Sequence, residues 1–340
     1  MNNHSTFLNK PIRITDQQWS KETIPLVSIS CITYNHEDYI RDAIDGFLMQ
    51  KTTFPVEILI HDDASTDKTA SIVREYELKY PQLIKPIYQT VNQYSKRDGT
   101  IGRLQRGRAR GKYYATCEGD DYWTDPLKLQ KQVDFMEANP TYSMCVHASK
   151  KVNVNGTDVG EIRPYSYSRS STPKDIILTS GNFFATSSYM VKKEIFNDNE
   201  PEFISLSPVG DYALNLLCIS IGGIYYIDEF MSNYRIGVPG SYITLLNRKS
   251  YREKAEKVKQ RIKMLHSYNK FTKYKYNGHV LKKIESLNFD LLVLSQRLKA
   301  TIKHSHFSKL PLIEKMKIII KSLLPLNIIQ LISKIKNSLS

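Results

Sequence analysis

Short apolar segments alternate with amphipathic segments over the first 150 residues, and this alternation constrains the fold more than any other feature of the sequence. The apolar segments have the composition of buried strands, and the amphipathic ones repeat apolar side chains at helical spacing. The expected strands are residues 26–34, 56–65, 83–89, 112–118 and 143–153, and the expected helices are residues 35–50, 65–80 and 125–140. Ser65 is the expected N-cap of the second helix. The pattern predicts an α/β fold with a Rossmann-like, mostly parallel sheet flanked by helices.

Polar side chains stand where three of these strands end. The first expected strand ends in Thr33 and Tyr34, and the second ends in Asp62 and Asp63. The fourth is followed directly by three acids within four positions. In open sheets of this kind, ligands bind outside the carboxyl ends of the strands. We therefore expect these three strand ends to converge on one site.

The acids after the fourth strand are Glu118, Asp120 and Asp121. Carboxylates this close repel one another unless a cation or a network of donors compensates them. Closely spaced oxygen ligands suit Mg²⁺ or Mn²⁺, which usually keep open positions for phosphate oxygens. The alternative is that these acids cap the helix that follows and accept hydrogen bonds from its free N–H groups.

The composition is that of a globular protein, because 340 residues with 41% hydrophobic content can bury a large core. The four cysteines are far apart in the sequence, and we expect them to be buried, reduced thiols. The first 25 residues lack the apolar core of a signal peptide, and no stretch reaches the roughly 18 apolar residues of a spanning helix. We expect the chain to stay on the cytosolic side.

The net charge of +14 is distributed unevenly. Residues 241–340 contain 22 Lys and Arg against 5 Asp and Glu, whereas residues 1–240 contain 26 against 29. The sequence beyond about residue 244 is also helical in its pattern. We therefore expect a basic, helical C-terminal region.

The last part of this region, residues 307–340, places Leu and Ile with lysines at helical spacing, and Leu324 and Pro325 should divide it into two helices. A basic amphipathic helix suits the surface of an anionic membrane. The alternative is a helical hairpin that packs its apolar stripe onto the rest of the protein. Nucleic acid is not an expected partner, because no recognised binding module accompanies the charge.

Four segments in this order and spacing carry a family resemblance: residues 27–50, 57–69, 109–132 and 210–235. Together they resemble the family 2 glycosyltransferases, and the resemblance runs from about residue 25 to about residue 242. It implies the GT-A fold and the transfer of a sugar from a nucleotide sugar with inversion of stereochemistry.

The resemblance also implies residues for nucleotide-sugar binding. Thr33 and Tyr34 would line the base pocket, with the aromatic ring against uracil or another base. Asp62 or Asp63 would accept a hydrogen bond from the base or the ribose, and the sequence leaves the choice between them open.

The family's D-x-D metal motif falls on Glu118, Gly119 and Asp120, with Asp121 following. The first position is Glu rather than Asp, which leaves the metal ligand open between Asp120 and Asp121. Asp120 is the first expectation, and it would also contact the nucleotide sugar. The family's general base matches Asp211, for which an N-cap role is the alternative.

Further residues are expected around the diphosphate and the acceptor. Arg97 and Arg103, in the Arg-rich segment after the third strand, are expected near the leaving phosphates. Tyr234 and Arg235 would close over the nucleotide. Trp123 would stack on an acceptor sugar, with core packing as the alternative.

These expectations divide the chain into an N-terminal extension (1–24), a GT-A domain (25–244) and a basic helical region (245–340). Within the domain, residues 25–121 would bind the nucleotide sugar and residues 122–244 the acceptor. The expected activity moves a sugar, UDP-linked, to a hydroxyl of a glycan or a lipid-linked acceptor in cell-surface polysaccharide synthesis, at the cytoplasmic face of the membrane. The alternatives are a nucleotidyltransferase, and a noncatalytic nucleotide-sugar-binding or membrane scaffold protein.

Overall fold

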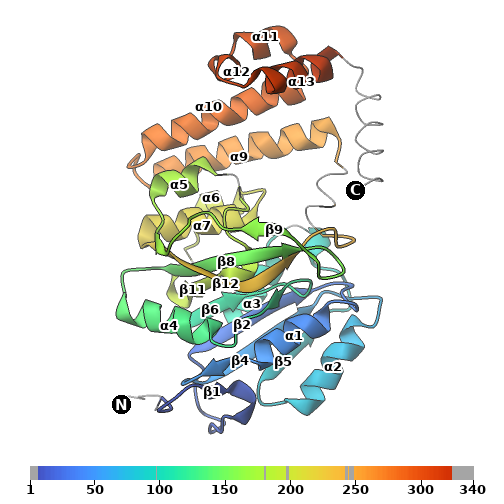
Figure 1. Cartoon of the computed structure of the whole chain (residues 1–340), viewed down its shortest axis with the longest axis vertical. Coiled ribbons are helices and arrows are strands. Elements are labelled where there is room, and N and C mark those ends of the chain that lie inside the picture. The colour runs from blue at the N-terminus through green and yellow to red at the C-terminus, as the bar shows by residue number, and fades with distance from the viewer. Residues whose placement is uncertain are drawn as a thin grey trace. The chain divides into compact units, whose positions relative to one another are not determined.

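The computed structural model describes residues 7–96, 98–179, 181–196, 199–241, 244 and 249–323 (Figure 1). The chain divides into two compact units. The first comprises Met1–Glu200 and Leu214–Val238, and the second comprises Pro201–Ala213 and Pro239–Ser340. Within the described part of the chain, no helix has the length and apolar character that crossing a bilayer requires.

A large mixed sheet forms the centre of the first unit. The strands of the unit are β1 (Ile12–Arg13), β2 (Val27–Thr33), β3 (Lys51–Thr52), β4 (Val56–Asp62), β5 (Ile84–Tyr88), β6 (Tyr113–Thr116), β7 (Tyr122–Trp123), β8 (Met144–Val152), β9 (Asp158–Ile162), β10 (Arg169–Ser170), β11 (Met190–Lys192) and β12 (Ile224–Arg235). The main sheet has the order β10-β12-β8-β11-β6-β2-β4-β5, with β7 paired to β12 and β9 paired to β8. β1 and β3 form a separate pair.

The strands β6, β2, β4 and β5 are all parallel to one another. This confirms the mostly parallel, Rossmann-like sheet expected from the sequence. β11 is antiparallel to both of its neighbours, β6 and β8, and β12 is parallel to β8. β8 and β12 therefore end at the same edge of the sheet as β2, β4 and β6.

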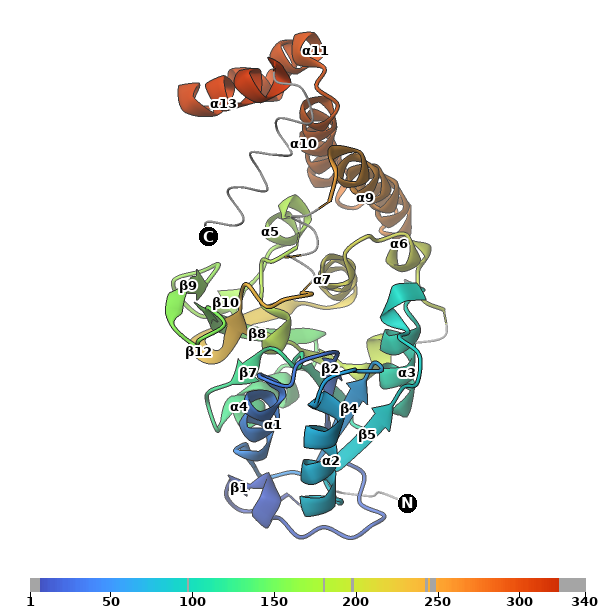
Figure 2. The same ribbon diagram turned by 90° about the vertical axis from the view of Figure 1, so that its right-hand side faces the viewer.

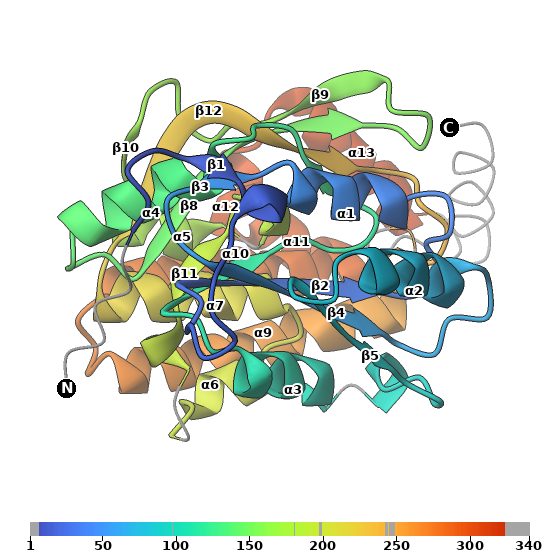
Figure 3. The same ribbon diagram turned by 90° about the horizontal axis from the view of Figure 1, so that it is seen from below.

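Helices cover both faces of the sheet. The helices of the first unit include α1 (Ile40–Leu48), α2 (Thr69–Lys79), α3 (Thr100–Arg108), α4 (Lys128–Ala138), α5 (Pro173–Leu178) and, from Leu214 onward, α7 (Gly210–Ile221). α1 and α2 lie on one face and α3 lies on the other (Figures 2 and 3). All seven residues of β4 are buried, as expected for a parallel strand covered on both faces. The four cysteines are free and buried, which agrees with the sequence prediction.

The second unit is helical. It contains α6 (Glu202–Ser205), the start of α7 (Gly210–Ile221), α9 (Tyr251–Phe271), α10 (Asn277–Leu294), α11 (Leu298–Lys303), α12 (Ser305–Ser308) and α13 (Leu312–Leu323). α9 and α10 lie side by side (Figure 1). The helical C-terminal region expected from the sequence is therefore present. The predicted helix break at Leu324 and Pro325 lies outside the described residues.

Candidate active site

The ends of β2, β4 and β6 meet at one edge of the sheet. Thr33 at the end of β2 is paired in register with Asp62 at the end of β4. After β6, the N–H of Gly119 donates to the carbonyl of Ile32, with N and O 2.9 Å apart. The acidic segment is thus tied to the end of β2, and the predicted convergence of the strand ends is confirmed.

Gly119 allows the acidic segment to approach β2 this closely. A Cβ at this position would stand 2.5 Å from Thr33 Oγ1 and 2.9 Å from His36 Nδ1. Such distances are far below van der Waals contact, so a larger residue would force the loop away from β2. The glycine between the two acidic positions therefore follows from packing.

Hydrogen bonds join the loop after β2 to the loop after β4. The backbone N–H of Asn35, which adopts a left-handed φ of 54°, donates to Ser65 Oγ at 2.9 Å. The Asn35 side-chain oxygen accepts from the N–H of Thr66 at 2.8 Å, and His36 N–H donates to Thr69 Oγ1 at 2.8 Å. Ser65 is therefore a bridge between the loops. The prediction of Ser65 as the N-cap of α2 is wrong, because α2 begins only at Thr69.

The structure distinguishes the two carboxylates at the end of β4. Both oxygens of Asp63 accept backbone N–H groups, from Gln93 at 2.8 Å and from Tyr94 at 2.9 Å. Asp62 accepts from the N–H of Ser65 at 3.3 Å through one oxygen. Its other oxygen, Oδ1, is buried and has no hydrogen-bond partner among the described residues. Asp63 therefore holds the loop after β5, whereas Asp62 Oδ1 remains available to accept a hydrogen bond.

Burial also raises the pKa of the Asp62 carboxyl group, with hydrogen bonds from Ser65 opposing the shift. An unpaired buried oxygen of this kind favours a donor from a ligand, since leaving it unpaired costs about 1–3 kcal/mol.

His36 also belongs to this edge, although the sequence did not single it out. Its Nδ1 lies 3.1 Å from Thr33 Oγ1, and its Nε2 lies 4.0 Å from Asp120 Oδ2. The pKa of His36 is lowered because the side chain is buried, and the carboxylates of Asp120 and Asp67 oppose this shift. His36 stands in the loop after β2, and its position in that loop was the only signal in the sequence that could have identified it.

Asp120 and Asp121 are the buried acids of the segment after β6, whereas Glu118 is exposed. Asp121 is 1% exposed, and burial, followed by the charge of Asp120, raises its pKa well above the usual value. Its Oδ1 accepts the backbone N–H of Arg235 at 2.8 Å. Its Oδ2 is buried and lacks a hydrogen-bond partner within the described chain.

These observations fit a divalent cation at this turn. Two adjacent carboxylates repel each other, and one of them carries a buried oxygen without a partner. A cation would relieve both conditions. No cluster of three or more His, Cys, Asp or Glu side chains in the described ranges could hold a metal alone. A cation here would take its other ligands from phosphate and water, as Mg²⁺ and Mn²⁺ commonly do.

Tyr234 and Arg235 stand at the end of β12, beside the acidic turn. Tyr234 is half-buried. The Arg235 side chain is only 4% exposed, and its guanidinium donates to the carbonyl of Asp120 and to the carboxylate of Asp42. The structure thus directs Arg235 into the protein, and its expected role in closing over a nucleotide remains a prediction that these contacts do not support.

Trp123 packs in the core. Its ring is 1% exposed and lies 4.9 Å from the ring of Phe47. Its Nε1 donates to the carbonyl of Ser187 at 2.8 Å, and the ammonium of Lys128 lies 4.0 Å from the ring centroid. These contacts are those of the core-packing alternative, and contact with an acceptor sugar remains a prediction.

The expected arginines occupy different situations. Arg97 lies outside the described residues. Arg103, in the first turn of α3, is exposed and donates to the carbonyl of Asp98 and to the hydroxyl of Thr100. These bonds fix the start of α3, a helix that the sequence did not predict.

Asp211 stands in the first turn of α7, within the second unit. It is half-buried, and its Oδ1 accepts the N–H of Tyr212 at 2.7 Å. It keeps the position near the start of a helix that the sequence predicted for it.

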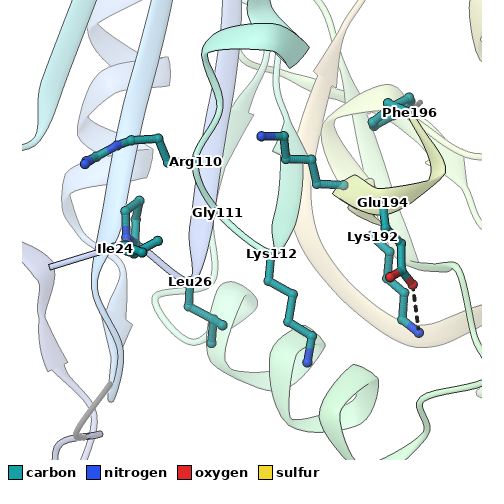
Figure 4. Close-up of a pocket in the computed structure, with 10 residues that line it drawn as sticks. Ile24, Leu26, Arg110, Gly111, Lys112, Lys192, Glu194 and Phe196 are labelled. Carbon is teal, nitrogen blue, oxygen red and sulfur yellow. Dashed lines mark ion pairs between the residues drawn. The ribbon is translucent and has the colours of Figure 1, made fainter. Parts of the chain in front are cut away.

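A cavity of about 510 Å³ lies at the opposite edge of the sheet, where β2 and β6 begin and β11 ends. Arg110, Lys112 and Lys192 line it, and Lys192 pairs with Glu194 (Figure 4). A second cavity of about 530 Å³ lies beside α1. The residues lining these two cavities do not include Asp62 or Asp120.

Comparisons with known proteins identify the family and the fold. The profile described as Glycosyl transferase family 2 matches residues 28–199. An uncharacterized protein of Mycobacterium tuberculosis is 39% identical over 211 residues, which cover 62% of this chain and 58% of the relative. The UDP-Glc:alpha-D-GlcNAc-diphosphoundecaprenol beta-1,3-glucosyltransferase WfaP of Escherichia coli is 33% identical over 117 residues, covering 34% of this chain and 43% of the enzyme. The match therefore spans less than two thirds of the length of either relative.

Two solved structures share the fold. The Staphylococcus aureus protein TarS, residues 1–349 with UDP-GlcNAc, gives a TM-score of 0.54 at 18% identity, covering 87% of this chain and 79% of that one. The mannosyltransferase PcManGT of Pyrobaculum calidifontis, in complex with GDP-Man and Mn²⁺, gives 0.55 at 14% identity, covering 96% and 90%. Together with the strand order, the acidic strand ends and the matched profile, these similarities show that the chain belongs to glycosyltransferase family 2 and has the GT-A fold.

Proposed function

We propose that the chain transfers a sugar from a UDP-sugar to a hydroxyl group of a glycan or a lipid-linked acceptor, in cell-surface polysaccharide synthesis. The observation that carries this proposal is the meeting of Asp62, with its spare buried oxygen, and the Asp120–Asp121 turn at one edge of the sheet. The UDP-GlcNAc bound to TarS and the name of WfaP support the choice of nucleotide and of acceptor class.

The nucleoside would bind between the loops after β2 and β4. The ring of Tyr34 is 43% exposed and is therefore available to stack on a base. Asp62 would accept an N–H or O–H group of the nucleoside through Oδ1. The hydrogen bonds from Asn35 and His36 to the second loop hold these groups in place before the donor arrives.

The diphosphate would lie at the acidic turn. Asp120 and Asp121 are the residues that would hold Mg²⁺ or Mn²⁺, and the Mn²⁺ in PcManGT supports this choice. When bound, the cation would neutralise negative charge that develops on the departing diphosphate. Arg97 and Arg103 would contact the phosphates, and Tyr234 would contact the nucleotide.

Asp211 is the proposed general base. Its carboxylate would take the proton of the acceptor hydroxyl while the oxygen attacks the anomeric carbon from the face opposite the diphosphate. The new glycosidic C–O bond forms as the bond from the anomeric carbon to the phosphate oxygen breaks. The bonding electrons leave with the nucleoside diphosphate, and the stereochemistry inverts.

We further propose that residues 25–244 carry the reaction, with nucleotide-sugar binding in 25–121 and acceptor binding in 122–244. Residues 245–340 would contact the cytoplasmic face of the membrane. The large apolar side chains of α13 are exposed between its lysines, which suits an anionic lipid surface. These side chains are Leu312, Ile313, Met316, Ile320 and Leu323.

Calorimetric titration of UDP, with GDP as the comparison nucleotide, tests the donor site. We expect UDP to bind in the presence of Mn²⁺, and we expect EDTA or Asp120→Ala to weaken binding at least tenfold. Glu161→Gln removes an exposed carboxylate on β9 and should bind UDP as the wild type does. Absence of UDP binding to the wild-type protein would overturn the proposed donor.

Asp211→Asn tests the catalytic step. Transfer from the UDP-sugar should fall at least a hundredfold, because the amide cannot take the proton, while UDP affinity stays unchanged. Glu256→Gln, an exposed acid on α9, is the matched control within the second unit. Equal rates in the two variants would remove the proposed base. If the wild-type protein binds UDP but transfers no sugar from a UDP-sugar, and neither variant differs from it, the chain would instead be a binding protein.

A further inference from the structure

Arg235, at the end of β12, donates hydrogen bonds to three groups of the acidic turn and α1. Its Nη1 donates to the backbone carbonyl of Asp120 at 2.7 Å, and its Nη2 donates to Asp42 Oδ2 on α1 at 2.6 Å. Its backbone N–H donates to Asp121 Oδ1 at 2.8 Å. One residue therefore links the acidic turn to both the sheet and α1.

Two aromatic rings lie close to the guanidinium. The ring centroids of Tyr39 and Tyr122 lie 4.7 Å and 4.9 Å from Arg235 Cζ. The hydroxyl of Tyr122 accepts from Asn233 Nδ2 at 2.7 Å, which fixes that ring to β12. A guanidinium this close to two aromatic rings gains cation–π attraction from each of them, which restricts its freedom to rotate.

The strand pairing extends this arrangement along the chain. β7 follows Asp121 directly and pairs with β12, with Tyr122 opposite Asn233 and Trp123 opposite Ser232. The N–H of Arg235 reaches the Asp121 carboxylate just beyond the last pair of this ladder. The acidic turn is therefore anchored by β12 on the side that follows Asp121 and by β2 on the side that precedes Asp120.

The guanidinium bonds a carbonyl of the turn and leaves its carboxylates available. The Nη atoms of Arg235 have the Asp120 carbonyl and the Asp42 carboxylate as partners. Asp121 Oδ2 stays without a hydrogen-bond partner in the described part of the chain. Asp42 therefore gives the guanidinium a carboxylate partner that lies outside the acidic turn.

We propose that Arg235 is a positioning residue for the acidic turn and that Asp42 is its necessary partner. Arg235 fixes the backbone at Asp120, and Asp42 holds the guanidinium in the orientation that leaves both site carboxylates for a cation. The proposal rests on the function proposed above. A purely structural role for Arg235 would change stability and leave the affinity for a cation unaltered.

The test uses Mn²⁺ alone as the probe, followed by electron paramagnetic resonance on the full chain without nucleotide. Arg235→Lys keeps the charge and loses the planar fork, so the Mn²⁺ dissociation constant should rise about tenfold or more. Asp42→Asn should give a similar rise although the Asp42 side chain is 51% exposed. The double variant should lose much less than the product of the two single effects, because the residues act as one unit. Asp38→Asn changes an exposed acid two residues before the start of α1; this variant is the matched control and should bind Mn²⁺ as the wild type does.

Amide hydrogen exchange of residues 117–123 without metal gives a second readout. Exchange in this segment should accelerate in Arg235→Lys and Asp42→Asn and stay unchanged in the control. Unaltered Mn²⁺ affinity in folded Asp42→Asn, or independent effects in the double variant, would overturn the proposal. So would failure of the wild-type protein to bind Mn²⁺. Mn²⁺ binding that responds to these substitutions, in a protein that does not bind UDP, would leave the positioning role standing and remove the proposed donor.

Discussion

Lys128 is a fully buried lysine at the start of α4, and it gives the sharpest prediction about stability. Its Nζ donates to Gln132 Oε1 at 2.8 Å and lies 4.0 Å from the centroid of the Trp123 ring. Burial lowers the pKa of its ammonium group from 10.5 to about 7. In the unfolded chain the same group keeps its ordinary pKa.

This difference fixes the sign of the pH dependence. Between pH 7 and 10.5 the unfolded chain binds a proton at Lys128 and the folded chain does not, so stability rises with pH through this window. Below pH 7 Lys128 is protonated in both the folded and the unfolded state, and the folded state bears the full cost of burying its charge. The shift corresponds to about 5 kcal/mol at about 1.4 kcal/mol per pKa unit.

The perturbation is Lys128→Met, which keeps the volume and removes the titration. The free energy of unfolding of this variant, minus that of the wild type, should be about 3–4 kcal/mol lower at pH 10 than at pH 7. Urea denaturation at several pH values measures it. Lys79→Met, an exposed lysine on α2, is the control and should show no such change. A difference between Lys128→Met and wild type that does not vary with pH would refute the reasoning.

Three further predictions concern the candidate site and α13. Asp62→Asn should weaken UDP binding at least tenfold in calorimetry with little loss of stability, whereas Asp63→Asn should lower the free energy of unfolding by about 1–3 kcal/mol because two backbone N–H groups lose a charged acceptor; equal effects on UDP affinity would contradict the distinction. Gly119→Ala should destabilise by about 1–3 kcal/mol and weaken UDP binding, since its Cβ would meet Thr33 Oγ1 at 2.5 Å; thermal melting and titration check both effects. Ile320→Glu should reduce cosedimentation with vesicles that contain anionic lipid, and unchanged binding would exclude α13 as the membrane contact.

The strands and the acidic ends of the sheet could be predicted because their signals are local. A buried parallel strand reads as a continuous apolar run, as in β4, and a carboxylate directly after it is visible in the sequence. The place of Asp120 beside the end of β2 then followed from the rule that parallel strands share an edge.

The contacts that define the site in detail could not be predicted, because they join distant parts of the chain. Arg235 and Asp42 are separated by 193 residues, and neither has a pattern that marks a pair. His36 reaches Asp120 only because Gly119 lets the two segments approach. α3 was missed because only two of its residues, Ile101 and Gln105, are buried, which gives too weak an apolar periodicity.

The hydrogen bonds between the loops after β2 and β4 have a thermodynamic consequence. Asn35 bonds both Ser65 and Thr66, and His36 bonds Thr69, so the two loops are already ordered as one body. A nucleoside that binds there loses its own freedom but does not have to order the chain, and each side chain left unordered would otherwise oppose binding by about 0.5–1.5 kcal/mol. The heat capacity change on binding should therefore be small and should report only the surface that the nucleoside covers.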